Sequence, residues 1–196
     1  MAAVEHQKLP LIETVRLALR PIGFGDVSAI ESLCGHDFDV VRWLTGFDWP
    51  YVSGTAAAFV EELIVSDPIA NEAVFAVTYE NAFVGVTAIE GPGELQDFPA
   101  LPSLGYWLGR PYHGRGFASE AARATLNWAF EAHDAPRIGA RVFQNNLASL
   151  KVLASLGFVE VGSEMRYSKV LKQEVDNRVL VLDRQHSHHY REVMNG

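Results

Sequence analysis

One segment in the middle of the chain sets an apolar strand, a loop with two glycines and an amphipathic helix in direct succession. Residues 104–108 are apolar and aromatic, Gly114 and Gly116 follow a proline, and polar residues then recur three and four positions apart over 117–133. That spacing leaves one helix face of small and apolar side chains for a core. A helix that begins directly after such a loop presents backbone N–H groups and the positive end of its dipole, which together bind phosphate groups.

The loop by itself is compatible with more than one interpretation. No Gly-Lys-Ser/Thr sequence follows the glycines, which excludes a Walker-type nucleotide loop. A dinucleotide fingerprint fits only in part, because the third small residue is missing and the nearby acid, Asp134, precedes the next strand instead of ending it. What remains is either another pyrophosphate site or a plain strand-to-helix turn in which the glycines supply only backbone freedom.

Elsewhere the chain alternates short strands and helices, with proline and glycine between them. Apolar alternation and short apolar runs predict strands at about 14–21, 73–79, 83–89, 104–108, 137–143, 159–171 and 178–183. Helices are predicted at about 26–34, 54–65, 117–133 and 147–156. Asp26 and Ser53 are expected to cap the first two helices, and Gly157 is expected to end the last. The consecutive strands between residues 73 and 108 imply an antiparallel meander.

Length, charge and hydropathy narrow the class of protein. At 196 residues the chain fits one domain with a substantial core, and no apolar run reaches the roughly 18 residues that span a bilayer. A net charge of −8 does not readily supply the basic face that nucleic-acid binding needs, and it favours a cationic partner. Because the N-terminal stretch lacks the apolar core of a secretory signal and Cys34 has no second cysteine to pair with, we expect a cytoplasmic protein without membrane or nucleic-acid partners.

Histidines can bind metals and a cysteine can act as a nucleophile, but the neighbouring sequence favours neither role here. His186, His188 and His189 lie in a polar tail at a spacing that fits no catalytic zinc site, so no metal is expected. Cys34 has no evident histidine partner and is expected to be a small buried residue instead of a nucleophile.

A second segment, NLASLKVLASLGF, follows the glycine loop one strand later. Together with ETVRLALRPIGFGDVSAI, DWPYVSGTAAAFVEEL and GYWLGRPYHGRGFASEA, in that order along nearly the whole chain, it resembles the GNAT superfamily of acetyl-CoA-dependent N-acetyltransferases. Within the superfamily the set is most similar to the ribosomal-protein alanine and serine N-terminal acetyltransferases. An ordered set of segments is much more specific than any one glycine motif.

The resemblance implies an α+β fold with a mixed, mostly antiparallel twisted sheet of about seven strands flanked by helices, in the order β-α-α-β-β-β-α-β-α-β-β. The fourth and fifth strands are expected to splay apart and admit acetyl-CoA, the acyl donor. Residues 1–196 would form one N-acetyltransferase domain, with a core at about 12–185 and a polar tail at 186–196. A homodimer is an expectation at the level of the family only.

The resemblance places the pyrophosphate of the donor on the backbone amides of the glycine loop, where small residues permit close approach. The loop positions are His113, Gly114, Arg115, Gly116, Phe117 and Ala118, with His113 in place of the commoner glutamine or arginine. Arg115 is expected to add a charged contact, or else to be a solvated surface residue. Tyr106, Trp107 and Leu108 are expected to bind the pantetheine arm as an added strand and to polarise the thioester carbonyl with a backbone N–H, unless both aromatic side chains are simply core residues.

The next helix supplies two further residues in the family pattern. Asn146 corresponds to a CoA-contacting asparagine, and Ser149 to a residue proposed to interact with the leaving sulfur. Asn146 is also a natural N-cap whose side chain would accept the Ser149 N–H. Many superfamily members carry a tyrosine as general acid where this chain has Leu153, which leaves Ser149, a water molecule or direct departure of the thiolate.

The acceptor amine must be neutral to attack the thioester, and an α-amine, with a reference pKa of about 7.7 to 8, needs little help. Glu90, at the end of a strand beside the loop, is the candidate base acting through water, and the alternative is an ordinary solvated residue. Trp43, Asp48 and Trp49 are expected to shape the acceptor site, with Asp48 attracting the amine, unless the aromatic side chains serve only packing.

These residues and the resemblance predict direct acetyl transfer in a ternary complex, with the N-terminal α-amine of a protein or peptide as the leading acceptor. Two alternatives stay open. One is acetylation of a small amine such as a polyamine, an amino acid or an antibiotic. The other is a noncatalytic CoA-binding module, which the missing tyrosine would explain.

Overall fold

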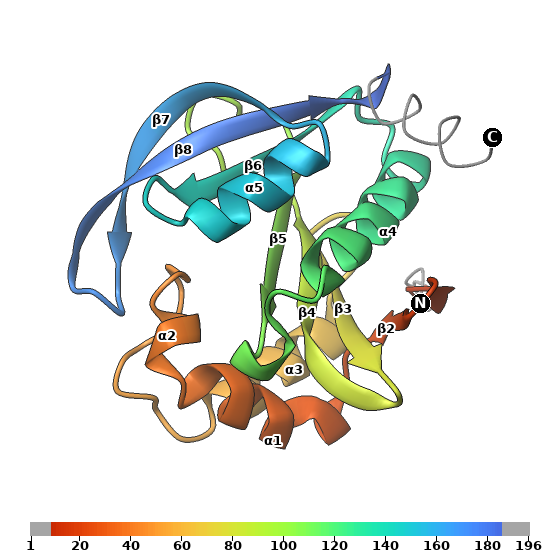
Figure 1. The fold of residues 1–196 in the computed structure, drawn as a ribbon, viewed down its shortest axis with the longest axis vertical. Coiled ribbons are helices and arrows are strands. Elements are labelled where there is room, and N and C mark those ends of the chain that lie inside the picture. The colour runs from red at the N-terminus through yellow and green to blue at the C-terminus, as the bar shows by residue number, and fades with distance from the viewer. Residues whose placement is uncertain (1–8, 186–196) are drawn as a thin grey trace, which may run out of the picture.

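The computed structural model describes residues 9–185 and builds them around one twisted sheet (Figure 1). Its strands are β1 (Ile12–Glu13), β2 (Leu17–Pro21), β3 (Glu72–Tyr79), β4 (Ala82–Glu90), β5 (Ser103–Leu108), β6 (Arg137–Phe143), β7 (Val159–Ser168) and β8 (Gln173–Asp183). Its helices are η1 (Phe24–Asp26), α1 (Val27–Ile30), η2 (Glu31–Gly35), α2 (Phe38–Val41), α3 (Thr55–Val65), η3 (Arg110–Tyr112), α4 (Phe117–Ala132) and α5 (Leu147–Ser155). The expected polar tail at 186–196 lies outside the described residues.

The strands lie in the order β1-β2-β3-β4-β5-β6-β8-β7, and all neighbours except β5 and β6 run antiparallel. β5 and β6 are parallel and meet at one residue pair, Ser103 with Gly139. Beyond this pair they diverge, since β5 keeps its register with β4 and β6 follows β8. The predicted fold class is therefore confirmed, with eight strands in the described part, and the sheet opens between the predicted fourth and fifth strands.

Helices cover both faces of the sheet and bury two separate apolar layers (Figure 1). On one face α4 and α5 bury Ala122 and Leu153 in the cluster that also holds Phe75 of β3. On the opposite face α1 and α3 bury Ile30 and Val60 against β3 and β4. The strands β3 and β4, next to the opening, are thus packed on both faces.

Two predicted chain reversals are confirmed in atomic detail. The hairpin between β3 and β4 closes with Glu80 and Asn81, both at positive φ (50° and 63°), which makes the loop one residue shorter than predicted. Gly157 follows α5 at φ 90°, and the Phe158 N–H donates to the Leu153 carbonyl at 3.1 Å. This is the left-handed helix ending that glycine permits without steric cost.

The first strand differs from its prediction. The alternating segment 14–21 becomes a strand only at Leu17, because Thr14 closes a turn in which its hydroxyl accepts the Leu17 N–H at 2.9 Å. Residues before the turn form β1, which folds back on β2 and adds the eighth strand. The apolar alternation over 14–21 puts Val15 on the same face as the buried Leu17 and Leu19, but Val15 is 96% exposed.

The first two helices also differ from prediction. The segment 26–34 consists of a 3-10 turn, a short α-helix and a π turn, and the unpredicted α2 follows it. Asp26 does not cap this segment through its side chain, since its carboxylate accepts hydrogen bonds from Arg20 at 2.6 and 2.8 Å. α3 starts behind Gly54, which adopts φ 89° and provides no side-chain cap, so the expected cap at Ser53 is wrong.

The β7–β8 hairpin reaches across the molecule towards α2 (Figure 1). β7 ends at Ser168 and β8 begins at Gln173, so the last strand is longer than the predicted 178–183. In the turn, Val170 is 5% exposed and packs in one cluster with Val40 and Val41. This contact brings the hairpin and α2 together beside the opening in the sheet.

Candidate active site

A cavity of about 790 Å³ occupies the opening between β5 and β6. Residues 104–108 line one side of it and residues 140–143 line the other, with the first turns of α4 and α5 beside them. Since β5 pairs with β6 only at Ser103, its edge along the cavity has no strand partner. An extended ligand can bind such an edge as an additional strand.

The start of α4 faces this cavity as an uncapped helix N-terminus. Gly116 is the N-cap residue, adopts φ 77° and offers no side-chain cap. Gly114, Gly116, Phe117 and Ala118 all line the cavity. Backbone N–H groups at an uncapped helix start, together with the helix dipole, form an anion site.

His113 and Arg115 occupy different positions around this loop. The Nε2 of His113 donates to the Leu108 carbonyl at 2.7 Å, so the ring lines the cavity and holds the end of β5. Arg115 is not among the lining residues, and its guanidinium lies over the rings of Tyr79 and Phe117 at 5.1 and 4.9 Å. The expected charged contact from Arg115 therefore requires a change in the side chain's position.

The start of α5 lines the same cavity. The Asn146 side chain accepts the Ser149 N–H at 3.2 Å and so caps the helix, while both residues also line the cavity. The Tyr106 hydroxyl donates to the Ser149 carbonyl at 3.3 Å, and burial raises the pKa of Tyr106 to about 12. Leu153 lines the cavity from the position where many superfamily members have tyrosine.

Glu90 lines the cavity from the last position of β4. Side chains alternate along a strand, so Glu90 lies on the same face as Ala88, which faces α1 and α3. Tyr106 lies on the opposite face, towards α4 and α5. The Ser103 hydroxyl donates to Glu90 Oε2 at 2.7 Å. A Cβ atom added at Gly105 would lie 3.3 Å from Glu90 Oε1, so the carboxylate lies over β5 on this face of the sheet. Glu90 and Tyr106 therefore border the cavity from opposite faces of the sheet.

Burial raises the pKa of Glu90 above its ordinary value, although the hydrogen bond from Ser103 opposes the shift. The nearby charge of Glu94 raises this pKa further. Glu72, which pairs with Glu90 across β3 and β4, has its pKa raised to about 7, first by burial and then by the charge of Glu90. A carboxylate with a raised pKa is a better proton acceptor at neutral pH than a solvated one.

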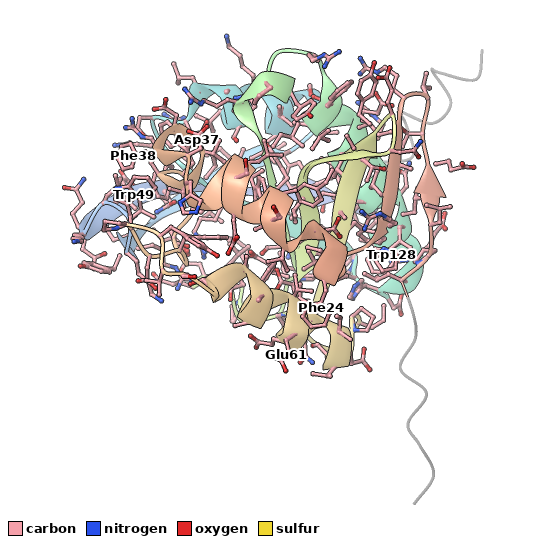
Figure 2. All side chains as sticks on the ribbon, turned by 90° about the horizontal axis from the view of Figure 1, so that it is seen from below. Phe24, Asp37, Phe38, Trp49, Glu61 and Trp128 are labelled. Atoms are coloured by element: carbon pink, nitrogen blue, oxygen red, sulfur yellow. The ribbon has the colours of Figure 1, made fainter. Side chains whose placement is uncertain are left out.

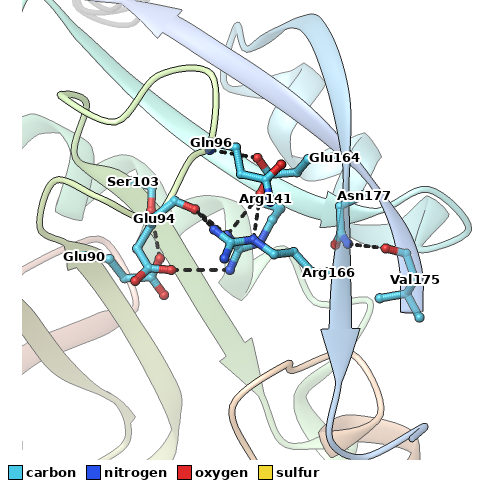
Figure 3. Close-up of polar contacts among 9 residues, drawn as sticks. All are labelled: Glu90, Glu94, Gln96, Ser103, Arg141, Glu164, Arg166, Val175 and Asn177. Atoms are coloured by element: carbon cyan, nitrogen blue, oxygen red, sulfur yellow. Dashed lines mark hydrogen bonds and ion pairs between the residues drawn. The ribbon is translucent and has the colours of Figure 1, made fainter. Parts of the chain in front are cut away.

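Two arginines on the far side of the opening bind the loop at 91–102, which follows Glu90 (Figure 3). Arg141 of β6 donates to the Glu94 carbonyl at 2.6 Å and to Glu164 Oε1 at 3.3 Å. Arg166 of β7 donates to Glu164 Oε1 at 3.0 Å and to the same Glu94 carbonyl. These bonds tie the loop to β6 and β7, and both arginines lower the pKa of Glu90.

Sequence reasoning missed Arg141 and Asn177, which both line the cavity. Arg141 carried a signal, because a charged residue inside an apolar strand needs a partner when the strand is buried. Asn177 is almost fully buried in β8 and donates to the Val175 carbonyl at 2.9 Å. It carried no comparable signal, since it falls outside the segment predicted as the last strand.

The aromatic segment after α2 divides into two parts. Trp43 lines the cavity, with its ring 6.0 Å from that of Phe143. Trp49 instead packs on Phe38 with ring centroids 5.2 Å apart, at the edge of the molecule (Figure 2), and Asp48 is exposed. Asp48 and Trp49 are not among the lining residues, so the cavity does not bring them together with Trp43.

Cys34 is fully buried, as expected, and burial raises the pKa of its thiol to about 12. Within residues 9–185 no three His, Cys, Asp or Glu side chains gather as metal ligands. His186, His188 and His189 lie outside that range. No helix in the described part of the chain is long and apolar enough to cross a membrane.

A family model described as "Acetyltransferase (GNAT) domain" matches residues 16–159, so the chain belongs to the GNAT acetyltransferase family. The N-acetyltransferase YjdG of Bacillus subtilis (strain 168), itself uncharacterized, is 28% identical over 156 residues, which are 76% of this chain and 89% of YjdG. The uncharacterized N-acetyltransferase p20 of Bacillus licheniformis is 38% identical over 73 residues, and the match spans 37% of this chain and 41% of p20.

Solved structures share the fold at lower identity. RimJ of Mycobacterium smegmatis, in complex with CoA-disulfide, superposes with a TM-score of 0.75 at 24% identity, covering 90% of this chain and 88% of that one. RimL, described as a ribosomal L7/L12 α-N-protein acetyltransferase in complex with coenzyme A, gives 0.74 at 18% identity, covering 89% and 98%. At these identities the likeness establishes the common fold.

Proposed function

We propose that the protein transfers the acetyl group of acetyl-CoA to the N-terminal α-amine of a protein or peptide. The observation that carries the proposal is the cavity, which joins an uncapped helix start, a free strand edge and the Glu90 carboxylate in one space of about 790 Å³. Membership of the GNAT family supports acetyl transfer, and the CoA complexes of RimJ and RimL support the donor.

The residues around the cavity fit acetyl-CoA. The backbone amides at the start of α4 hold the pyrophosphate, since Gly116 and Ala118 present no large side chain that blocks close approach. The free edge of β5 holds the pantetheine arm by main-chain hydrogen bonds. Asn146 and Ser149 then lie at the thioester end. Acetyl-CoA supplies an activated carbonyl carbon.

Glu90 serves as the base in this scheme. It accepts a proton from the amine, directly or through one water molecule, as the nitrogen bonds to the carbonyl carbon and the carbon–sulfur bond breaks. A backbone N–H of β5 stabilises the oxyanion, and the Ser149 hydroxyl donates a hydrogen bond to the departing thiolate. Because Glu90 and Tyr106 border opposite faces, the amine and the donor approach from opposite sides of the sheet, without an acyl-enzyme.

An α-amine suits this site better than a lysine side chain. Its reference pKa of about 7.7 to 8 leaves a sizeable neutral fraction at neutral pH, whereas lysine titrates at about 10.4. A carboxylate with a raised pKa is sufficient to remove the remaining proton. RimL, an α-N-protein acetyltransferase that shares this fold, supports the same acceptor class.

Release of free CoA thiol from acetyl-CoA, with a panel of acceptors, tests the proposal. Peptides that start with serine or alanine should be acetylated, and the same peptides with a blocked N-terminus and an internal lysine should not. Polyamines, amino acids and aminoglycosides complete the panel. Activity confined to the small amines would reject the peptide acceptor, and tight acetyl-CoA binding without turnover on any acceptor would reject catalysis.

A further inference from the structure

One arginine near the N-terminus holds both the glycine loop and the first turn of α4. Arg16, in the turn between β1 and β2, donates from Nε to Glu120 Oε2 at 2.7 Å, and its terminal nitrogen lies 2.6 Å from the same oxygen. Its other terminal nitrogen donates to the Arg115 carbonyl at 2.8 Å. A single guanidinium group thus binds a side chain of the helix and a backbone group of the loop.

The same turn satisfies the second oxygen of Glu120. Oε1 accepts the backbone N–H of Arg16 at 2.8 Å and the hydroxyl of Thr14 at 2.6 Å. Burial alone would raise the pKa of Glu120, but the hydrogen bonds from Thr14 and Arg16 outweigh it and hold this pKa below its ordinary value. Glu120 is therefore ionised at neutral pH.

An ionised Glu120 conflicts with the anion site. It lies in the first turn of α4, where a negative charge stabilises the empty helix through the dipole and repels a second anion. The protein also carries a net charge of −8, which adds to the repulsion. A pyrophosphate can approach this turn only if the carboxylate is neutralised locally.

Arg16 lies beside the loop, where its positive charge neutralises the Glu120 carboxylate. Its terminal nitrogen lies 3.3 Å from the position of a Cβ atom added at Gly116, so the guanidinium occupies the space beside the N-cap residue where a side chain would project. Its bond to the Arg115 carbonyl also orients the peptide group that joins Arg115 to Gly116. In a trans peptide the N–H points away from the carbonyl oxygen, so the Gly116 N–H is turned away from Arg16.

We propose that Arg16 is a positioning residue for the donor pyrophosphate: it cancels the charge of Glu120 and fixes the orientation of the amide at Gly116. The proposal rests on the proposed function only in that the donor carries a pyrophosphate. Arg16 itself need not touch the donor, because it acts through Glu120 and through the loop backbone.

Isothermal titration of CoA and acetyl-CoA into three variants tests the charge argument. Arg16→Gln should weaken binding about tenfold, because it leaves the negative charge of Glu120 uncancelled near the pyrophosphate. Glu120→Gln should bind at least as tightly as the wild type, and the double variant should recover part of the loss. Arg178→Gln is the matched control, since Arg178 has a similar exposure (41% against 43%), pairs with Glu160 at 2.8 Å and does not line the cavity.

A donor without a pyrophosphate separates positioning from a general structural effect. S-acetyl-pantetheine should bind wild type and Arg16→Gln equally, and thermal unfolding should confirm that both are folded. An equal loss with both donors, wild-type CoA affinity in Arg16→Gln, or no recovery in the double variant would overturn the proposal. If the wild type itself fails to bind CoA, the proposed function is what fails.

Discussion

The two ends of the cavity are built from different kinds of groups. The proposed donor end consists mainly of backbone, namely the uncapped start of α4 behind Gly116 and the free edge of β5. The acceptor end consists of side chains, with Glu90 between the Ser103 hydroxyl and the charges of Arg141 and Arg166. A backbone site needs only the correct local conformation, whereas a proton acceptor needs a pKa that several distant residues set together.

Glu90→Gln should show the largest difference between the two ends of the cavity, because it should affect kcat and leave donor affinity unchanged. Loss of the base should reduce kcat by about 100-fold or more, while the dissociation constant of acetyl-CoA stays unchanged because the donor binds the other face. Steady-state kinetics and titration calorimetry measure the two quantities. Glu160→Gln, which changes an exposed carboxylate on β7, is the control and should leave both at their wild-type values. A loss of donor affinity as large as the loss of kcat would break the distinction.

Gly116→Val should show the opposite pattern. Valine at φ 77° strains the loop by about 1–2 kcal/mol and displaces the amides that bind the pyrophosphate, so donor affinity should fall about 10- to 100-fold. Gly162→Val on β7 is the control, because Gly162 has open space around it and no positive φ. Unchanged acetyl-CoA affinity in a folded Gly116→Val protein would reject this position for the pyrophosphate.

Ser149 lies where the two ends of the cavity meet, and Ser149→Ala tests its role there. The backbone groups of Ser149 keep their bonds to Asn146 and Tyr106, so the variant removes only the hydroxyl. Loss of one hydrogen bond to the departing thiolate should reduce kcat by about tenfold, with little change in donor affinity. A wild-type kcat would mean that the thiolate leaves without help from Ser149.

Ser103→Ala should have the smallest effect on the maximal rate and should instead shift its pH dependence. Glu90 must be ionised to accept a proton, so kcat/KM rises with pH through the pKa of Glu90, which burial raises. The Ser103 hydrogen bond lowers that pKa, and its removal should move the acidic limb upward by about one pH unit. An acidic limb that stays in place would exclude Glu90 as the group that titrates.

Much of the fold could be predicted because the relevant signals are local. The spacing of polar residues over 117–133 predicted one buried helix face, on which Ala121 and Ala129 lie, and Gly157 marked the end of α5. Where prediction was wrong, a side chain had found another partner. Asp26 bonds to Arg20 instead of capping a helix, and Val15 is exposed because it lies within the turn that Thr14 closes with Leu17.

The candidate site shows the same division. The glycine loop and Ser149 were placed at the cavity by their motifs, whereas Asp48 and Trp49 lie elsewhere because Trp49 packs on Phe38. Arg141 was missed, although its charge inside an apolar strand was a usable signal. No pattern within a few residues could show that its partners would be Glu94 and Glu164.

The sequence by itself determined the helix that follows the glycine loop, the hairpin between β3 and β4 and the helix ending at Gly157, since each depends on residues a few positions apart. Only the tertiary structure decided the electrostatics of both ends of the cavity. Glu90 meets Ser103 across 13 positions, Arg141 meets Glu94 across 47 and Arg16 meets Glu120 across 104. Charge and burial act through space, so contacts between such distant residues, and the pKa values they set, exist only once the sheet has formed.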